Sequence, residues 1–294
     1  MEPCMPIRTI DVELPTADFA EIYRTVDGID LGIHFYQPAD AKSPTPAVVF
    51  YFGGGWRSGS IGQFQLQADY LKQRGVTCCL VEYRIKSKHG VTPFACVEDG
   101  RSAMRYIREH ASRLNIDVDR ICASGGSAGG HVAANTAFAK NCDAANDNLA
   151  IDPTPAAMFL FNPVLDTVVE SWQARSHNDT VNALLEDFGS RGVDVSPIHQ
   201  VQRGLMPVTI VHGEDDVTVP FNQTTDFAQR MQDAGNDCHV IGYPGYGHGF
   251  FNYRDGKKPE AFIDTLERMD DFLVHLGWLD DNAFVKSYVA SLEA

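Results

Sequence analysis

The chain has 294 residues, with 39 acidic and 24 basic side chains and a formal net charge of −15 at pH 7. This charge argues against binding to nucleic acid or to anionic membrane surfaces, and no apolar run approaches transmembrane length. The length suits one large domain without linker or repeat, so we expect a single domain over residues 1–294. Homo-oligomerisation is left open.

Segments typical of strands and helices alternate along the chain. They are, in order, a hairpin turning at 26–29, a strand ending at 52, a helix over 63–73, a strand over 76–82, a helix over 94–111, a strand ending near 123, a helix from 128, strands over 157–162 and 207–212, a helix over 222–234, a strand over 238–243 and a final helix over 259–276. This alternation predicts an α/β fold, with a mostly parallel twisted sheet covered by helices on both faces. The near-continuous apolar runs fit strands buried on both sides.

The seven cysteines show no metal-binding spacing. Cys78, Cys79, Cys122 and Cys238 fall in predicted strands, where a free cysteine usually acts as a small apolar core residue. The odd number and the lack of an apolar leader near Met1 favour a reducing, cytoplasmic compartment, although a removed signal peptide would leave no trace. The ten histidines form no HExxH pair. We therefore expect neither metal nor cofactor.

A G-G-S-A-G sequence at residues 125–129 joins a predicted strand to a predicted helix. Such a sharp turn lifts the hydroxyl of Ser127 above the sheet, and glycines at both ends relieve the crowding in the bend. A serine placed in this way is a candidate nucleophile, although the pattern alone also fits an ordinary loop.

A serine nucleophile needs a histidine to take its proton and a carboxylate to orient that histidine. The order Ser, Asp, His is completed by Asp216, after the strand over 207–212, and by His248, in a glycine-rich loop after the last strand. Asp215 competes for the acid role. His131 lies four residues beyond Ser127, but it fits a packed helix histidine better than a functional one.

The sequence Y-F-G-G-G-W at residues 51–56 directly follows a predicted strand. Three glycines let backbone N–H groups converge on a developing oxyanion, together with the N–H of Ala128. A rival interpretation is a loose dinucleotide loop ending at Gly59, with Glu82 as the ribose-binding acid. That alternative leaves Ser127 and the other two candidate residues unexplained.

On these motifs the sequence resembles the α/β-hydrolase superfamily, and within it the esterases of the hormone-sensitive-lipase and acetyl-esterase type, over about residues 23–272. The resemblance implies an α/β-hydrolase fold in which Ser127 is the nucleophile, His248 the general base and Asp216 the acid. It also implies that Gly54, Gly55 and Ala128 donate to the oxyanion. The acid register, four residues before a proline, favours Asp216 over Asp215.

The sequence departs from this family where Phe52 replaces the histidine that usually precedes the three glycines. That histidine orients the loop in the family, so we expect Phe52 to anchor the loop by packing. Trp56, after the glycines, either narrows the site or holds the loop in place.

Residues 164–195 fit a regular β/α unit least well. In the resembled family, an insertion at this point covers the active site. Either a small cap or a surface loop with a short helix fits this segment. A cap this short favours an open site that admits a bulky alcohol portion, such as an acylated sugar, over a deep tunnel for long acyl chains.

The sequence therefore predicts a serine carboxylic-ester hydrolase for short acyl esters, including acetylated carbohydrates, that acts on small molecules without a cofactor. Two alternatives remain open. One is hydrolysis of small amides, as in arylformamidases. The other is a non-catalytic ligand-binding protein of the same fold, which the presence of His248 disfavours.

Overall fold

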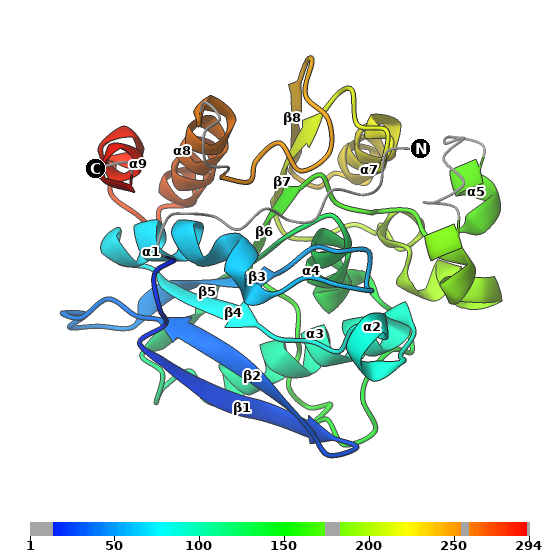
Figure 1. Ribbon diagram of the computed structural model, residues 1–294, viewed down its shortest axis with the longest axis horizontal. Helices are drawn as coiled ribbons and strands as arrows, with labels where there is room; N and C mark the ends of the chain where they lie inside the picture. The colour runs from blue at the N-terminus through cyan, green and yellow to red at the C-terminus, as the bar shows by residue number, and fades with distance from the viewer. Residues whose placement is uncertain (1–13, 174–182, 254–258, 293–294) are drawn as a thin grey trace.

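The computed structural model describes residues 14–173, 183–253 and 259–292. At its centre is an eight-stranded sheet with the order β1-β2-β4-β3-β5-β6-β7-β8 (Figure 1). The strands are β1 (Phe19–Val26), β2 (Ile29–Tyr36), β3 (Thr45–Tyr51), β4 (Thr77–Val81), β5 (Ile116–Gly126), β6 (Ala157–Phe161), β7 (Val208–Gly213) and β8 (Cys238–Tyr243). Strand β2 pairs antiparallel with β1 and β4, and all other neighbouring pairs are parallel. The predicted mostly parallel sheet is confirmed.

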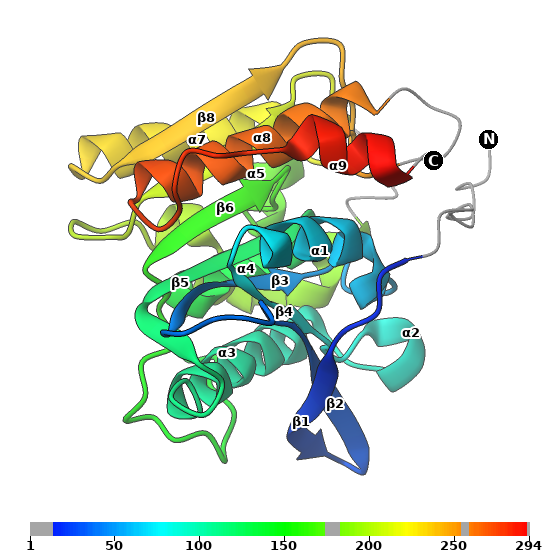
Figure 2. The ribbon, with the colours of Figure 1, turned by 90° about the vertical axis from the view of Figure 1, so that its left-hand side faces the viewer.

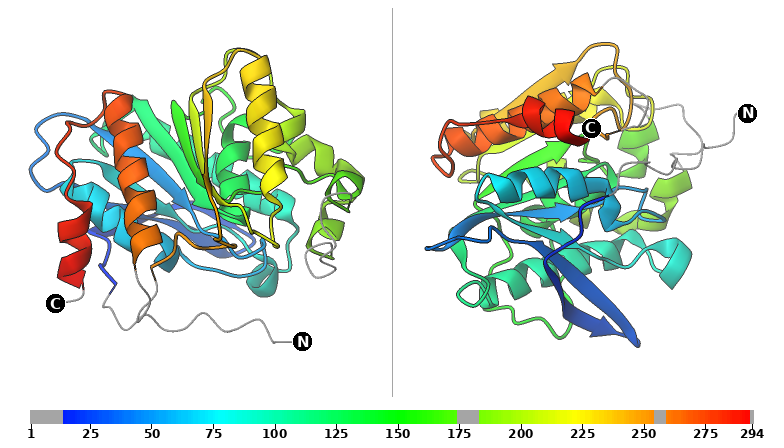
Figure 3. Two further views of the ribbon diagram at one scale, coloured as in Figure 1. Left: turned by 90° about the horizontal axis from the view of Figure 1, so that it is seen from above. Right: turned by 60° about the vertical axis from the view of Figure 1, so that its left-hand side comes forward.

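Helices cover both faces of the sheet (Figures 2 and 3). They are η1 (Ile61–Phe64), α1 (Gln65–Gln73), α2 (Lys86–His89), α3 (Pro93–Glu109), α4 (Ala128–Phe138), α5 (Val169–Gln173), η2 (Glu186–Val195), η3 (Pro197–His199), α7 (Phe221–Asp233), α8 (Glu260–His275) and α9 (Val285–Leu292). Helices α1, α8 and α9 pack into the core on one face, and α3, α4 and α7 into the core on the other. Within the described ranges, no helix is both long and apolar enough to cross a membrane.

The expectation that the helix over 259–276 is the last one is wrong, because α9 follows it. This helix is only eight residues long, so its apolar periodicity spans little more than two turns and is hard to recognise. It docks through buried Tyr288, whose hydroxyl donates to the carbonyl of Leu66 at 2.8 Å and whose ring lies 5.5 Å from that of Tyr70. The short helix α2 was not predicted either.

The alternation of side chains in β3 supplies both cores. Ala47, Val49 and Tyr51 belong to the core beneath α3 and α4, whereas Val48 and Phe50 belong to the core beneath α1 and α8. Successive residues of a strand point to opposite faces, so a strand buried on both sides is apolar throughout. This explains the uninterrupted apolar runs of the sequence.

The four strand cysteines are buried free thiols, as predicted. Burial raises the pKa of the Cys122 thiol to about 12 and the pKa of the Cys238 thiol to about 12, so both stay protonated at neutral pH. Cys4 lies outside the described residues.

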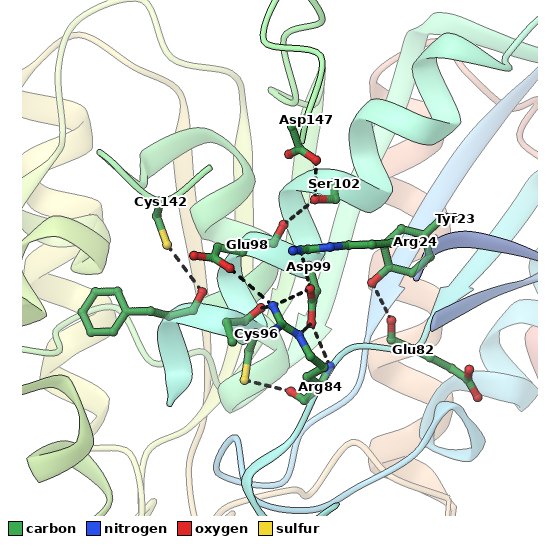
Figure 4. A network of polar contacts seen from close by, with 12 residues as sticks. Tyr23, Arg24, Glu82, Arg84, Cys96, Glu98, Asp99, Ser102, Cys142 and Asp147 are labelled. Carbon is green, nitrogen blue, oxygen red and sulfur yellow. Dashed lines mark hydrogen bonds and ion pairs between the residues drawn. The ribbon is translucent and has the colours of Figure 1, made fainter. Parts of the chain in front are cut away.

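A buried ion-pair network holds the segment that follows β4 (Figure 4). The Arg84 guanidinium donates to Asp99 on α3, from Nε to Oδ2 at 2.8 Å and from Nη2 to Oδ1 at 2.9 Å. Arg24 of β1 donates to the same Oδ1 at 2.6 Å, and the Asp99 side chain has no exposed surface. One carboxylate thus ties the first hairpin, the end of β4 and α3 together.

We predict that Asp99→Ala lowers the free energy of unfolding by about 3–5 kcal/mol, because it removes the fully buried partner of Arg84 and leaves that guanidinium with only the partly exposed Glu98 carboxylate, 3.3 Å away. Asp194→Ala, which removes the partner of the 57% exposed Arg191, is the control and should cost at most about 1 kcal/mol. Urea denaturation of both variants measures the difference. Equal losses would show that the Asp99 network adds nothing beyond a surface pair.

Candidate active site

Strand β5 turns into helix α4 at Ser127, whose backbone has φ 55° and ψ −121°. A non-glycine residue rarely adopts a positive φ, and such strain is common at functional sites. A Cβ on Gly125 would lie 2.5 Å from the carbonyl oxygen of Gly129, and one on Gly129 would lie 2.1 Å from that of Tyr51. Both glycines of the predicted turn therefore occupy places with no room for a side chain.

The loops after three parallel strands bring the three predicted side chains together. Ser127 follows β5, Asp216 follows β7 and His248 follows β8. His248 Nε2 lies 2.9 Å from Ser127 Oγ, and His248 Nδ1 lies 2.6 Å from Asp216 Oδ2. A carboxylate only accepts hydrogen bonds, so Nδ1 carries the proton and Nε2 is left to accept from the serine hydroxyl.

The environment of the two neighbouring acids separates their roles. Asp216 is 6% exposed, and its Oδ1 accepts from the backbone N–H groups of Thr218 at 2.8 Å and Val219 at 2.9 Å. Asp215 is exposed, and its backbone N–H donates to the carbonyl of Tyr246 at 3.0 Å. The acid in contact with the histidine is Asp216, and Asp215 is a loop residue.

A second histidine, His212, also contacts the Asp216 carboxylate. Its Nε2 lies 3.2 Å from Asp216 Oδ2 and 3.0 Å from the carbonyl oxygen of Val219, while its Nδ1 lies 2.7 Å from Thr224 Oγ1. Because both partners of Nε2 only accept, that nitrogen carries the proton and the Thr224 hydroxyl donates to Nδ1. His212 was not predicted as a site residue, although it lies only four residues before Asp216 in the sequence.

The hydrogen bonds to Asp216 control its ionisation. Burial raises the pKa of this carboxyl, but hydrogen bonds from His212 and His248 outweigh burial and hold the pKa well below its usual range. Asp216 is therefore ionised at neutral pH, as it must be to orient His248.

The glycine loop lies directly against the turn at Ser127. A Cβ on Gly53 would lie 3.4 Å from Ser127 Cβ, while Gly54 and Gly55 have φ values of 129° and 61°. The Gly53 N–H donates to Gln63 Oε1 at 2.6 Å. Across the part of the chain that the structure describes, the N–H groups of Gly54 and Gly55 have no protein acceptor.

Ala128 supplies the third predicted N–H. It is the first residue of α4, where N–H groups have no acceptor within the helix. Ser127 is thus followed by the predicted donor Ala128 at the start of α4 and lies close to Gly53, the first glycine of the loop that carries the other two predicted donors.

Phe52 lies where the resembled family usually has a histidine. Its ring stacks on that of Tyr83, with centroids 4.1 Å apart and planes 12° apart, and the Tyr83 hydroxyl donates to the Phe52 carbonyl. Phe52 is 4% exposed. The expected anchoring by packing is therefore present, and it comes from the residue next to Arg84 of the buried network.

Trp56 and His131 are core residues that hold the loop. Trp56 Nε1 donates to His131 Nδ1 at 3.3 Å, and His131 Nε2 donates to the carbonyl of Val195 at 2.7 Å. Trp56 is 3% exposed and His131 is completely buried. Burial lowers the pKa of His131 to about 4, so the ring is neutral. Trp56 thus supports the loop instead of narrowing the site.

The described part of the expected cap rests on the glycine loop. Asp187 forms ion pairs with Arg57 at 3.2 Å and Lys86 at 2.6 Å, and a Cβ on Gly55 would lie 3.2 Å from Leu184. Residues 174–182 of the expected segment lie outside the described residues. The described part of residues 164–195 therefore meets the loop that carries the predicted oxyanion donors.

Other candidate sites in the described part of the chain are less suited to chemistry than the one around Ser127. The hollow of about 560 Å³ beside Lys72 and Arg120 lies near the amino end of β3, whereas ligands of open α/β sheets bind beyond the carboxyl ends. Among the described residues, no three histidine, cysteine, aspartate or glutamate side chains are grouped so that they could hold a metal ion. A second Ser-His contact, from Ser196 Oγ to His199 Nδ1 at 2.9 Å, involves a completely buried serine.

The chain is similar to several known esterases. The BD-FAE family model matches residues 33–231. A structure of esterase 2 from Thermogutta terrifontis is 41% identical, with a TM-score of 0.83 over 92% of this chain and 98% of that chain. Carboxylesterase NlhH of Mycobacterium tuberculosis is 26% identical over 259 residues, which are 78% of this chain and 75% of NlhH. An acetylxylan esterase of Xylanibacter ruminicola is 26% identical over 224 residues, 71% of this chain and 43% of the esterase.

The fold and these similarities define an α/β-hydrolase of the esterase class, of the hormone-sensitive-lipase type that the motifs predicted. The chain belongs to the BD-FAE family. The matched part covers only about half the length of several curated relatives, namely 53%, 52% and 54% of three of them.

We predict that Asp216→Asn flattens the dependence of folding stability on pH in acid. The folded pKa of Asp216 is depressed below the ordinary value of 3.8, so its charge stabilises the fold above about pH 4 and this contribution is lost at lower pH. Urea denaturation at several pH values measures this slope.

The matched control for this experiment is Asp215→Asn, which removes the neighbouring exposed carboxylate. It should keep the slope of the unmodified protein. Indistinguishable slopes for the two variants would contradict the assignment of the buried acid.

Proposed function

We propose that this protein hydrolyses carboxylic esters through a covalent acyl-enzyme on Ser127, without a cofactor. The observation that carries the proposal is the continuous contact from Asp216 through His248 to the Ser127 hydroxyl, beside the glycine loop. A purely ligand-binding role would give this contact no purpose.

Acylation begins when Ser127 Oγ attacks the ester carbonyl carbon while His248 Nε2 takes the hydroxyl proton. The carbonyl oxygen becomes an oxyanion, which accepts hydrogen bonds from the N–H groups of Gly54, Gly55 and Ala128. The intermediate collapses as the bond to the alcohol oxygen breaks, and the imidazolium of His248 gives its proton to that oxygen.

Deacylation repeats these steps with water as the nucleophile. His248 takes a proton from water, and the resulting hydroxide adds to the acyl carbon to form a second oxyanion at the same N–H groups. Collapse releases the carboxylic acid and returns the proton to Ser127. Throughout, Asp216 holds the His248 tautomer and stabilises its positive form.

The proposed substrates are short acyl esters, including acetylated carbohydrates. Esterase 2 from Thermogutta terrifontis has structures with propionate and with butyrate bound, and one similar protein is an acetylxylan esterase. In this chain, Leu184 lies close to Gly55, which limits the space beside the proposed oxyanion donors. We further propose that residues 1–294 form one domain and that residues 164–195 are a small cap on it.

We predict that a serine-directed organophosphonate labels Ser127 with one equivalent, because His248 activates that hydroxyl. Mass spectrometry of the digested protein locates the label. Ser127→Ala should remain folded and lose at least about a thousandfold in kcat. The control is Ser196→Ala, which should still take up the label. An active preparation labelled at another serine would refute the assignment.

We predict that p-nitrophenyl esters with two to four acyl carbons have higher kcat/KM than those with eight or more. A longer chain gains about 0.8 kcal/mol per methylene only where an apolar tunnel buries it. A series from two to twelve carbons, measured below saturation, tests this. A maximum at eight carbons or beyond would replace the short-acyl proposal with a lipase-like pocket.

A further inference from the structure

Gln63 joins two loops that are far apart in the sequence. It lies in η1, ten residues after Gly53, and its Oε1 accepts from the Gly53 N–H at 2.6 Å. Its Nε2 donates to Asn252 Oδ1 at 3.0 Å, and Asn252 Nδ2 donates to the carbonyl of Gly249 at 2.8 Å. The chain of bonds thus runs from the glycine loop to the residue that follows His248.

The orientation of both side-chain amides in this bridge is determined by their backbone partners. A backbone N–H only donates, so the oxygen of Gln63 must face Gly53 and its NH₂ group must face Asn252. The Gly249 carbonyl only accepts, so Asn252 presents its NH₂ there and its oxygen to Gln63. Only this orientation of the two amides pairs a donor with an acceptor at all three contacts.

The bridge formed by Gln63 and Asn252 passes close to Gly126, the residue before Ser127. A Cβ on Gly126 would lie 3.5 Å from Gln63 Nε2, and one on Gly53 would lie 3.4 Å from Gln63 Oε1. Gln63 therefore occupies the N–H of Gly53 and leaves those of Gly54 and Gly55 for a ligand. Among the described residues, its side-chain hydrogen bonds go to Gly53 and Asn252 and to none of the three proposed catalytic side chains.

We propose that Gln63 is a positioning residue that sets the oxyanion loop in register with the loop carrying His248. This inference rests on the proposed function, because it assigns Gln63 a role in that same reaction. In the resembled esterases a histidine before the three glycines orients the loop, whereas this chain has Phe52 there. Phe52 holds the start of the loop by stacking, and Gln63 holds its first glycine from the other side.

The test uses Gln63→Met, which keeps the length of the side chain and removes both hydrogen bonds. Misplacing donors by a fraction of an ångström mainly affects the transition state, so kcat for p-nitrophenyl butyrate should fall about 10- to 100-fold while KM changes less than about threefold. Inhibition by a trifluoromethyl ketone, whose adduct with serine carries an oxyanion, should weaken by a similar factor.

Gln65→Met is the matched control. Gln65 lies two residues away, and its Nε2 donates to the carbonyl of Pro15 at 3.2 Å and to the Tyr36 hydroxyl at 3.1 Å, away from the site. This variant should keep kcat within about twofold, whatever its effect on Tm. The second test variant is Gln63→Glu, which keeps the acceptor for Gly53 but sets a carboxylate oxygen against Asn252 Oδ1, so its kcat should stay below that of the unmodified protein because the link to the loop carrying His248 is broken.

Two results would overturn the inference. One is a Gln63→Met variant with kcat within twofold of the unmodified protein. The other is a loss of kcat that Gln65→Met reproduces at equal change in Tm. Ser127→Ala separates this inference from the proposed function: if that variant still turns over substrate, the proposed function fails, and if it is inactive while Gln63→Met is fully active, only the role of Gln63 fails.

Discussion

The close approach of two backbones at the carboxyl ends of β3 and β5 is the constraint on which the site depends. Gly129 lies so near the Tyr51 carbonyl that a Cβ would come within 2.1 Å of the oxygen. This contact brings the start of α4 against the start of the glycine loop, the two segments that carry the proposed oxyanion donors. A side chain at Gly129 would separate the two halves of the proposed oxyanion site.

Because glycine loops are flexible, the contact is useful only if the loop is held on its other sides. Tyr83 stacks on Phe52 at the loop's start, and the next residue, Arg84, pairs with buried Asp99 on α3. Trp56 holds the far end through His131. The loop's geometry therefore depends on the core beneath α3 and α4, which connects the stability of that core to the alignment of the site.

Much of the fold and the site was predictable because it rests on local patterns. The alternation of strand and helix segments predicted the sheet, and the turn at Ser127, the acid and His248 each follow a recognisable strand. The structure brings these three side chains together in the predicted order. The features that were missed depend on contacts between residues far apart in the sequence. Gln63 and Asn252 are 189 positions apart, and no local sequence pattern indicates that their side-chain amides meet. Helix α9 was missed because it is only eight residues long and docks through a contact with Leu66, which is far away in the sequence.

The sharing of Asp216 between two histidines shows how the fold meets the cost of a buried charge. An ionised carboxylate without partners would be neutralised in the core, so four donors surround it: two backbone N–H groups at Oδ1, and His248 and His212 at Oδ2. Only His248 reaches the serine. His212 is bound to Thr224 of α7, so the helix that covers β7 and β8 also fixes the direction of the carboxylate. The orientation of the proposed general base thus depends on the packing of α7, through Thr224 and His212.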